Sequence, residues 1–267
     1  MLKDITLGQY YPADSVIHRL DPRVKLFSTI LYIVALFLVN NIWGWILVTA
    51  FLICMIGLSR VPFSMMLKGV RAIWVLIVIT AVCNLFFTQE GEVLWQWKAL
   101  AVTGTGIHNT IYYSLRLVFL VVGTSVMTLA TSPNKLTDGM EEGFKFLSKI
   151  GVPIHEIAMM MSIALRFIPI LSEEADKIRK AQMARGADFD EGGLLKKAKG
   201  LIPILVPLFV SAFRRANDLS QAMEARCYHG GEGRTKMKPL KYRGADYRAY
   251  AVVFAFLTAV ILIRIFL

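Results

Sequence analysis

Two consecutive apolar stretches, VKLFSTILYIVALFLVNN at residues 24–41 and IWGWILVTAFLICMIGLS at residues 42–59, decide the fold class of this chain. An α-helix rises about 1.5 Å per residue, so about 20 mostly apolar residues cross the hydrocarbon core of a bilayer. Each stretch is close to that length, and Asn40 and Asn41 mark a turn between them. The two stretches therefore predict a hairpin of membrane-spanning helices.

Three further stretches have the same character, at residues 69–88, 107–131 and 248–267. The chain of 267 residues is 56% hydrophobic and 18% charged, which is too apolar for a water-soluble domain of this length. Residues 1–23 are fairly polar and show no cleavage site after a short apolar run, so we expect no removable signal peptide. We expect an all-α integral membrane protein with about five transmembrane helices.

The basic residues predict the orientation of these helices. Residues 132–246 contain most of the chain's 30 basic and 19 acidic residues, and further basic residues flank the first three spans, at Lys3, Arg19, Arg23, Lys25, Arg60, Lys68 and Arg71. Basic segments stay in the cytoplasm, so we expect a cell-membrane protein with its N-terminus inside and its C-terminus outside. The net charge of +11 then reflects topology and not nucleic-acid binding.

This pattern divides the chain into three parts. Residues 1–131 hold an N-terminal tail and transmembrane helices 1–4, residues 132–246 form cytoplasmic coupling helices, and residues 247–267 form the last span. Apolar residues recur every three or four positions in 155–186 and in 201–226, as on one face of a helix. Both helices are apolar first and charged later, so we expect them to begin against the bilayer and run into the cytoplasm.

Two smaller features belong to the same segment. A shorter helix is expected at 134–149, after the cap-like Ser132 and with Pro133 in its first turn. Pro169, Pro203 and Pro207 lie inside or at the start of the two long helices. Each removes one backbone donor, which favours a bend.

Catalytic and metal-binding patterns are incomplete. His155 and Glu156 begin an HExxH pattern, but Met159 stands where the second histidine belongs. The chain has no DDxxD cluster and no GxxxxGK[ST] phosphate loop, so we expect no cofactor or metal on this chain, and a partner must supply any energy. The three cysteines form no CxxC pair, so we expect free thiols at Cys54, Cys83 and Cys227.

Two charged features leave alternatives open. Glu173 and Glu174 with Arg179 approach the pattern of some intramembrane proteases, which makes an integral-membrane hydrolase one alternative function. Arg179 lies on another helical face, however, and an exposed helix surface is favoured. Arg116 lies inside the fourth predicted span beside Tyr112, where a pair within the protein or a snorkelling side chain is favoured over a functional charge.

The two long helices end in similar sequences, KAQMARGADFD at 180–190 and QAMEARCYHGG at 221–231. Aligned on the arginines, they pair Ala184 with Ala225, Arg185 with Arg226 and Gly186 with Cys227. Gly186 is suited to a left-handed turn that ends a helix, and we expect Gly230 and Gly231 to do the same after the second. Small neighbours allow close approach, and a guanidinium binds a carboxylate through two hydrogen bonds, so we expect similar binding sites on partner proteins.

These ends, with HRLDPRVKLF at 18–27 and LRFIPIL at 165–171, make the chain resemble EcfT, the transmembrane coupling subunit of energy-coupling factor transporters. The resemblance covers most of the chain. It implies a non-enzymatic scaffold in an ATP-binding-cassette importer for vitamins or metal ions. Two cytoplasmic ATPases, which hold ATP and Mg, would bind Arg185 and Arg226, and a small membrane protein would capture the substrate. Cys227 departs from the family's Ala-Arg-Gly signature, because the first end has Gly186 at the corresponding position.

A run of methionines offers a second candidate contact. Met159, Met160 and Met161 suit a surface that adapts to several partners, such as different capture subunits, although ordinary packing is favoured. A basic membrane-surface interaction protein is the second alternative function; it would bind lipid or nucleic acid in a salt-dependent way. The paired helix ends favour the transporter subunit, for which we expect no nucleic-acid partner.

Overall fold

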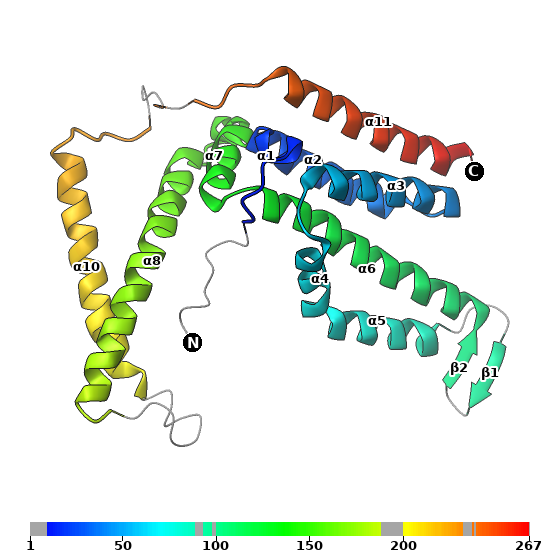
Figure 1. Ribbon diagram of the computed structural model, residues 1–267, viewed down its shortest axis with the longest axis horizontal. Helices are drawn as coiled ribbons and strands as arrows, with labels where there is room; N and C mark the ends of the chain where they lie inside the picture. The colour runs from blue at the N-terminus through cyan, green and yellow to red at the C-terminus, as the bar shows by residue number, and fades with distance from the viewer. Residues whose placement is uncertain are drawn as a thin grey trace. The chain divides into compact units, whose positions relative to one another are not determined.

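The computed structural model describes residues 10–88, 93–97, 100–187, 200–231, 237 and 239–266 (Figure 1). The chain forms two compact units. The first, here called the bundle unit, consists of Gly8–Met140 and Leu240–Leu267; the second, called the arm unit, contains Glu141–Pro239. The three-part division expected from the sequence remains a prediction. Lys3 and the end of the quoted stretch 180–190 lie outside the described residues.

Helices make up most of the described residues of both units. The bundle unit contains α1 (Val16–Arg19), α2 (Pro22–Leu38), α3 (Ile42–Ser59), α4 (Phe63–Ala72), α5 (Trp74–Phe87), α6 (Gly104–Ala130) and α11 (Gly244–Phe266), and α7 spans Pro133–Gly143. The arm unit contains the 3₁₀ helix η2 (Lys145–Ile150), α8 (Ile154–Ala184) and α10 (Ile202–Glu224). The expected all-α membrane class is confirmed. An antiparallel hairpin, β1 (Val93–Trp97) and β2 (Leu100–Thr103), is an addition that the sequence does not predict.

Several helices are long and apolar enough to cross a membrane. Among the described residues these are α3, α6, α8 and α11, and the bent pair α4 and α5 adds a fifth candidate. α2 has 17 residues, at the short end of the length that spans a bilayer. The chain is therefore a multi-pass membrane protein.

The span expected at 69–88 is bent, because the structure breaks it at Ile73. α4 and α5 meet there at 58°, and the Ile73 N–H bonds to the Val70 carbonyl at 3.1 Å, only three residues back. α4 is amphipathic and carries Lys68 and Arg71, whereas α5 is uncharged and mostly apolar. An amphipathic segment is stable at a membrane surface and an apolar one inside it, so a bend between them satisfies both.

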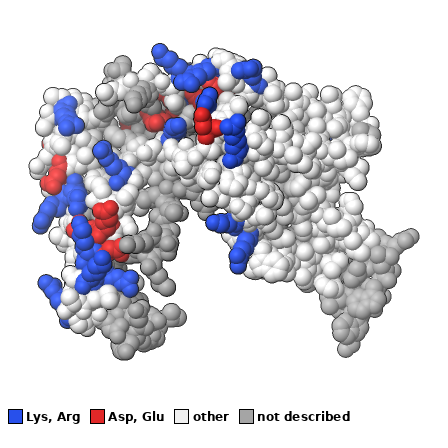
Figure 2. Space-filling view, viewed as in Figure 1, with Lys and Arg blue, Asp and Glu red and all other residues white. Residues whose placement is uncertain are grey.

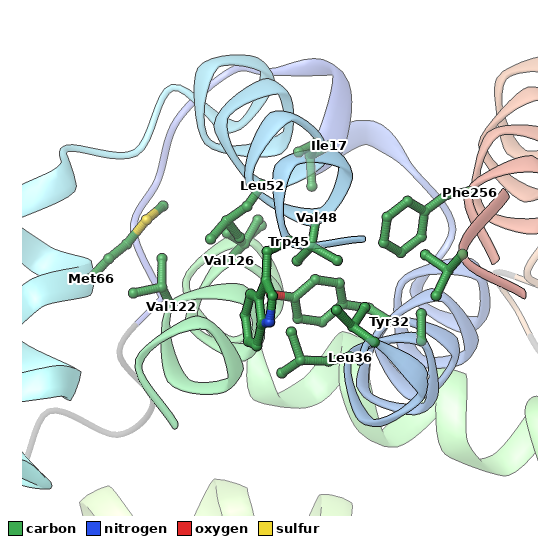
Figure 3. Close-up of a cluster of buried hydrophobic side chains, with 14 of the residues drawn as sticks. Ile17, Tyr32, Leu36, Trp45, Val48, Leu52, Met66, Val122, Val126 and Phe256 are labelled. Atoms are coloured by element: carbon green, nitrogen blue, oxygen red, sulfur yellow. The ribbon is translucent and has the colours of Figure 1, made fainter. Parts of the chain in front are cut away.

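The core of the bundle unit lies where α2, α3 and α6 pack together (Figure 3). Tyr32 of α2 is buried there, and its hydroxyl donates to the Phe119 carbonyl at 2.9 Å. A Cβ on Gly123 of α6 would lie 2.2 Å from the Tyr32 ring, so this close approach requires glycine. Phe51 of α3 stacks on Phe256 at 4.1 Å, which joins α11 to the same core.

The segment HRLDPRVKLF forms a buried polar anchor at the start of α2. Asp21 accepts the backbone N–H of Arg23 and pairs with its guanidinium at 3.0 Å. The Asp21 N–H donates to the Asp246 carboxylate at 2.8 Å, and Lys25 Nζ donates to the Ala130 carbonyl at 2.9 Å. These bonds tie the start of α2 to the start of α11 and the end of α6, which explains why charged side chains occur beside an apolar core.

Arg116 is bound to the end of α2. Its guanidinium donates to the Val39 carbonyl at 2.9 Å, and the Tyr112 hydroxyl donates to the same oxygen. Val39 follows the last residue of α2, where helix carbonyls lack partners within the helix. The interpretation of Arg116 as one member of a pair within the protein is confirmed.

Most basic residues of the bundle unit gather at one end of its helices, whereas Arg116 and Arg264 lie elsewhere. Figure 2 shows an uncharged surface over most of α3, α5 and α6. Lys and Arg lie where α2 and α11 begin and α3 and α6 end, at Arg19, Arg23, Lys25, Arg60, Lys68, Arg71, Lys241, Arg243 and Arg248. This one-sided charge is typical of the cytoplasmic side of a membrane protein. The orientation itself remains a prediction.

Candidate functional site

The candidate site lies on α8 and α10 of the arm unit, which run in opposite directions and pack against each other (Figure 1). An ion pair joins Glu174 of α8 to Arg215 of α10 at 2.9 Å. Nearer the end of α8, Gln182 donates to the Pro203 carbonyl at 3.4 Å. The end of α8 therefore lies beside the start of α10. The expectation that both helices begin against the bilayer and run into the cytoplasm is wrong, because their first halves lie at opposite ends of the pair. Both helices continue through the prolines inside them.

α8 ends at Arg185 in a Schellman motif, a common helix ending with two reversed hydrogen bonds. The Gly186 N–H bonds to the Met183 carbonyl and the Ala187 N–H bonds to the Gln182 carbonyl, both at 3.0 Å. Gly186 has a φ of +87°, which is left-handed backbone. The two bonds satisfy carbonyls that a helix end otherwise leaves open. The predicted role of Gly186 is confirmed.

α10 ends at Arg226 with the same pair of hydrogen bonds. The Cys227 N–H bonds to the Glu224 carbonyl at 2.9 Å, and the Tyr228 N–H bonds to the Met223 carbonyl at 3.1 Å. Cys227 has a φ of +53°. Counted from the arginine, donor and acceptor positions are the same in the two ends, so the backbone presents Arg185 and Arg226 in the same way.

The expectation that Gly230 and Gly231 end the second helix is wrong, because Cys227 takes the left-handed position. Gly230 has a φ of +99° but lies three residues beyond this turn. Gly231 packs on His155, whose ring would lie 2.3 Å from a Cβ at that position. Left-handed backbone costs a residue with a side chain roughly 1 to 2 kcal/mol. The end of α10 therefore keeps this turn at a cost in free energy for Cys227, whereas glycine at the end of α8 adopts the same backbone without that cost.

Both arginines are exposed. The short side chains beside them are exposed as well, at Ala184, Gly186, Ala225 and Cys227. Within the part of the chain that the structure describes, neither the Arg185 nor the Arg226 guanidinium has an ion pair or a hydrogen bond. A guanidinium has five N–H donors in a planar fork. Among the described residues, each end therefore presents an exposed cationic group between small, exposed side chains.

The two arginines lie at opposite ends of the helix pair. Gln182, three residues before Arg185, bonds to Pro203 in the first turn of α10. α10 has 23 residues, so its two ends are about 35 Å apart at 1.5 Å per residue. A separation of about that length between Arg185 and Arg226 excludes a single small binding pocket for both.

The first halves of α8 and α10 expose apolar side chains. These are Ile157, Met160, Met161 and Ile168 on α8, and Ile202, Leu205, Val206, Phe209, Val210 and Phe213 on α10. Ala158 is the buried residue of α8, and α10 buries none of its described residues. Met159, the first of the three methionines, is half-buried. Apolar surface of this extent marks a contact with a membrane or another protein.

α8 corresponds to the helix expected at 155–186, whose first part was expected to lie against the bilayer. Its length and apolar content qualify it to enter a membrane, although its second half carries several charged residues, among them Glu173, Asp176, Lys177 and Lys180. The apolar first part is suited to contact with the bilayer or with a membrane protein, and the charged second part to water.

Glu173 and Glu174, the pair considered for catalysis, do not act at one site. Glu174 pairs with Arg215, whereas Glu173 is exposed. His155 Nδ1 bonds to a carboxylate oxygen of Glu141 at 2.9 Å. The described residues contain no group of three or more side chains arranged to hold a metal ion.

The cysteines at 54, 83 and 227 are free, as expected, and they are exposed.

Two of these partners, Arg215 and Glu141, are not singled out in the sequence. The only sign of the Glu174–Arg215 ion pair in the sequence is that the two long helices carry opposite charges. Which acid meets which base depends on how α8 packs against α10, and the spacing within one helix does not determine that.

The bundle of apolar helices and the two equivalent arginine-bearing ends define a multi-pass membrane protein built to contact other subunits. Residues 13–237 match the model of a family described as CbiQ, cobalt transport protein. The chain is 54% identical over 266 residues to the energy-coupling factor transporter transmembrane protein EcfT of Clostridium kluyveri, covering 99% of this chain and 98% of that protein. It is 46% identical over 246 residues to the EcfT of Bacillus subtilis, covering 92% and 93%. The chain belongs to this family of transporter membrane components.

Proposed function

We propose that this chain couples two cytoplasmic ATPases of the ATP-binding-cassette type to a substrate-capturing membrane subunit, and that Arg185 and Arg226 each bind one ATPase. The observation that carries the proposal is the identical hydrogen bonding of the two helix ends. Two equivalent ends about 35 Å apart suit two similar sites on two similar partners. The name shared by the relatives, energy-coupling factor transporter transmembrane protein, agrees with an assembly of this kind.

Each end has the chemistry of a recognition element for an acidic groove. A guanidinium makes two parallel hydrogen bonds to a carboxylate, which a lysine does not reproduce. The small residues on either side, Ala184 and Gly186 at one end and Ala225 and Cys227 at the other, let a partner surface reach the arginine. The left-handed turn ends the helix immediately after the arginine, so no further helical turn obstructs the approach.

The chain itself is non-catalytic in this proposal, and ATP and Mg are held by the partner ATPases. The ion pair of Glu174 with Arg215 disfavours the hydrolase alternative, because a catalytic glutamate pair needs both carboxylates at one site. The absence of a phosphate loop from the sequence supports an energy source on another subunit.

The proposed orientation places the N-terminus and residues 132–246 in the cytoplasm and the C-terminus outside the cell. Its support is the gathering of basic residues at the end of the bundle unit where α2 and α11 begin (Figure 2). Membrane topology accounts for the positive charge of the chain, so nucleic acid is not among the proposed partners.

The small membrane subunit that captures a vitamin or another micronutrient would contact the exposed apolar part of α8, including Met159, Met160 and Met161. Movement of the ATPases would carry the two arginine ends and swing both helices. The Glu174–Arg215 pair and the Gln182 hydrogen bond connect α8 to α10, so the two helices move together. That motion would tilt the capture subunit.

Purification of the chain from its native membrane in mild detergent, followed by mass spectrometry of the bound proteins, tests the proposed function. Two ATPases and one small hydrophobic protein are expected. Hydrolase activity of the chain without an ATPase would support the first alternative instead. Salt-sensitive binding to lipid or nucleic acid without a stoichiometric ATPase would support the second.

A further inference from the structure

An apolar cavity of about 400 Å³ opens among the helices of the bundle unit. Its wall includes Tyr32 of α2, Met55 of α3, Val126 of α6 and Val252 of α11. This volume lies within the range of cavities that bind small ligands. Leu58 and Val252, which line it, are 45% and 57% exposed on helices that qualify as membrane spans. The cavity is therefore accessible from the lipid phase.

A second cavity, with charged side chains in part of its wall, adjoins the first. The two share Val16, Leu58 and Ala245 as lining residues. Asp14, Arg19 and Arg60 line the second cavity, and Arg248 and Lys25 line the first. The two adjacent cavities, here together called the joined cavity, therefore combine an apolar chamber with positively charged side chains at the basic end of the bundle unit.

Most of the positive charge along the joined cavity is not neutralised within the described residues. Asp14 pairs with Arg19 at 2.6 Å, and this hydrogen bond lowers the pKa of Asp14, so the two charges cancel. Arg60 donates to the Asp14 backbone carbonyl at 3.4 Å and lies near enough to lower the pKa of the Asp14 carboxyl, but it forms no ion pair among the described residues. The described residues provide Arg248 with neither an ion pair nor a hydrogen bond.

Lys25 adds a buried charge to the wall. It is 5% exposed, and its Nζ donates to two neutral acceptors, the carbonyls of His18 and Ala130, although an ammonium has three donors. A buried amine beside an apolar chamber attracts an anionic group, because no carboxylate bonds to it in the described structure.

Arg60 provides an independent indication that its position is functional. It follows the last residue of α3 with a φ of +55°, left-handed backbone where glycine is ordinarily favoured. An arginine there is strained, because a side chain is disfavoured in left-handed backbone. A strained residue that lines a cavity is a candidate for ligand contact.

We propose that the joined cavity binds one anionic phospholipid from the leaflet at the basic end of the bundle unit. One acyl chain fills the apolar chamber, and the phosphate lies at the basic end against Arg60 and Arg248. The apolar wall accommodates the chain by the hydrophobic effect, and the unpaired arginines select a negative headgroup. The site lies within the bundle unit and is independent of the arginine ends of α8 and α10.

Native mass spectrometry of the full chain, titrated in mild detergent with phosphatidylglycerol or with phosphatidylcholine of the same acyl length, tests this proposal. One phosphatidylglycerol should remain bound and should resist release better than phosphatidylcholine. Arg60→Gln and Arg248→Gln should each weaken phosphatidylglycerol binding about fivefold, since one basic residue near a lipid headgroup contributes about 1 kcal/mol. Neither change should alter phosphatidylcholine binding. Ala249→Trp should abolish both by filling the chamber.

Two variants of α11 serve as matched controls. Arg264→Gln removes a charge at the other end of the helix, and Leu262→Trp adds an indole at an exposed site; both should retain the lipid. If Ala249→Trp lowers the unfolding temperature in lipid-free detergent, the two arginine variants alone decide. Equal retention of the two lipids, or arginine variants that behave like Arg264→Gln, would overturn the proposal. So would occupation of the cavity by a protein segment instead of lipid, seen as a cross-link from residue 249.

Discussion

Gly186 and Cys227 hold the same left-handed backbone position at the ends of α8 and α10, with φ values of +87° and +53°. Glycine adopts this conformation freely, whereas cysteine does so against a cost of roughly 1 to 2 kcal/mol. The two residues share no side-chain chemistry. What they share is a turn that ends the helix directly after an arginine, and this turn is the feature on which the coupling proposal depends.

Substitutions at these two positions should therefore have opposite effects. Cys227→Gly removes the local cost and should raise the free energy of unfolding by about 1 kcal/mol, whereas Gly186→Ala should lower it by about the same amount. Thermal unfolding of the arm unit within the full chain in detergent measures both changes. Retained ATPase binding by Cys227→Gly is also expected. Loss of that binding would show that the thiol, and not the turn, matters.

The ion pair between Glu174 and Arg215 should be a modest link between α8 and α10. The two side chains are 29% and 39% exposed, so solvent screens the pair and a coupling free energy of at most about 1 kcal/mol is expected. A double-mutant cycle with Glu174→Gln and Arg215→Gln measures it. Glu173→Gln, which changes an exposed neighbour, is the control and should have no effect. Exchanging the two charges should restore most of the loss.

Gly123 should tolerate no side chain while Tyr32 is present. A Cβ at residue 123 would lie 2.2 Å from the Tyr32 ring. Gly123→Ala should therefore lower the free energy of unfolding by about 1 to 3 kcal/mol, the typical cost of overpacking a core. Gly57→Ala on α3 is the control, because no heavy atom lies within 4 Å of a Cβ there. The unfolding temperature of each variant in detergent provides the measurement. Equal values for the two would contradict the packing described for α2 and α6.

The methionine run should matter for partner choice. Replacing Met159, Met160 and Met161 with leucine and alanine should reduce binding of some capture subunits more than others, because a flexible methionine surface adapts where a stiffer one does not. Pull-down of several capture subunits with the variant measures the differences. A uniform reduction, or none, would assign these residues to ordinary packing.

The membrane class and most of the spans could be predicted because apolar length is a property of local sequence. The stretches 24–41 and 42–59 correspond closely to α2 and α3. The break at Ile73 was missed because the average apolar content of 69–88 does not reveal where an amphipathic helix gives way to an apolar one. The β1–β2 hairpin was missed because the strands VLWQW and LAVT are short and lie between two predicted spans.

For the candidate site too, features set by local sequence could be predicted, whereas contacts between distant helices could not. The two arginines were found because Ala-Arg and a following small residue form a local repeat, and the local hydrogen bonds reproduce that repeat. The turn that ends the second helix was expected at Gly230 and Gly231 because glycine is the usual residue in left-handed backbone. Nothing in the local sequence indicates that Cys227 adopts this conformation instead. The partners of Glu174 and Asp246 depend on contacts between helices distant in sequence.

The central claim is that Arg185 and Arg226 hold the ATPases. Its most direct test is the charge-reversed double variant, Arg185→Glu with Arg226→Glu, purified from a membrane that also contains the ATPases and the capture subunit. Arg179→Glu with Arg214→Glu, which reverses charges within the same two helices, is the matched control. The account predicts loss of stoichiometric ATPases and of substrate uptake in the first variant only. Intact assembly and uptake in that variant would contradict it.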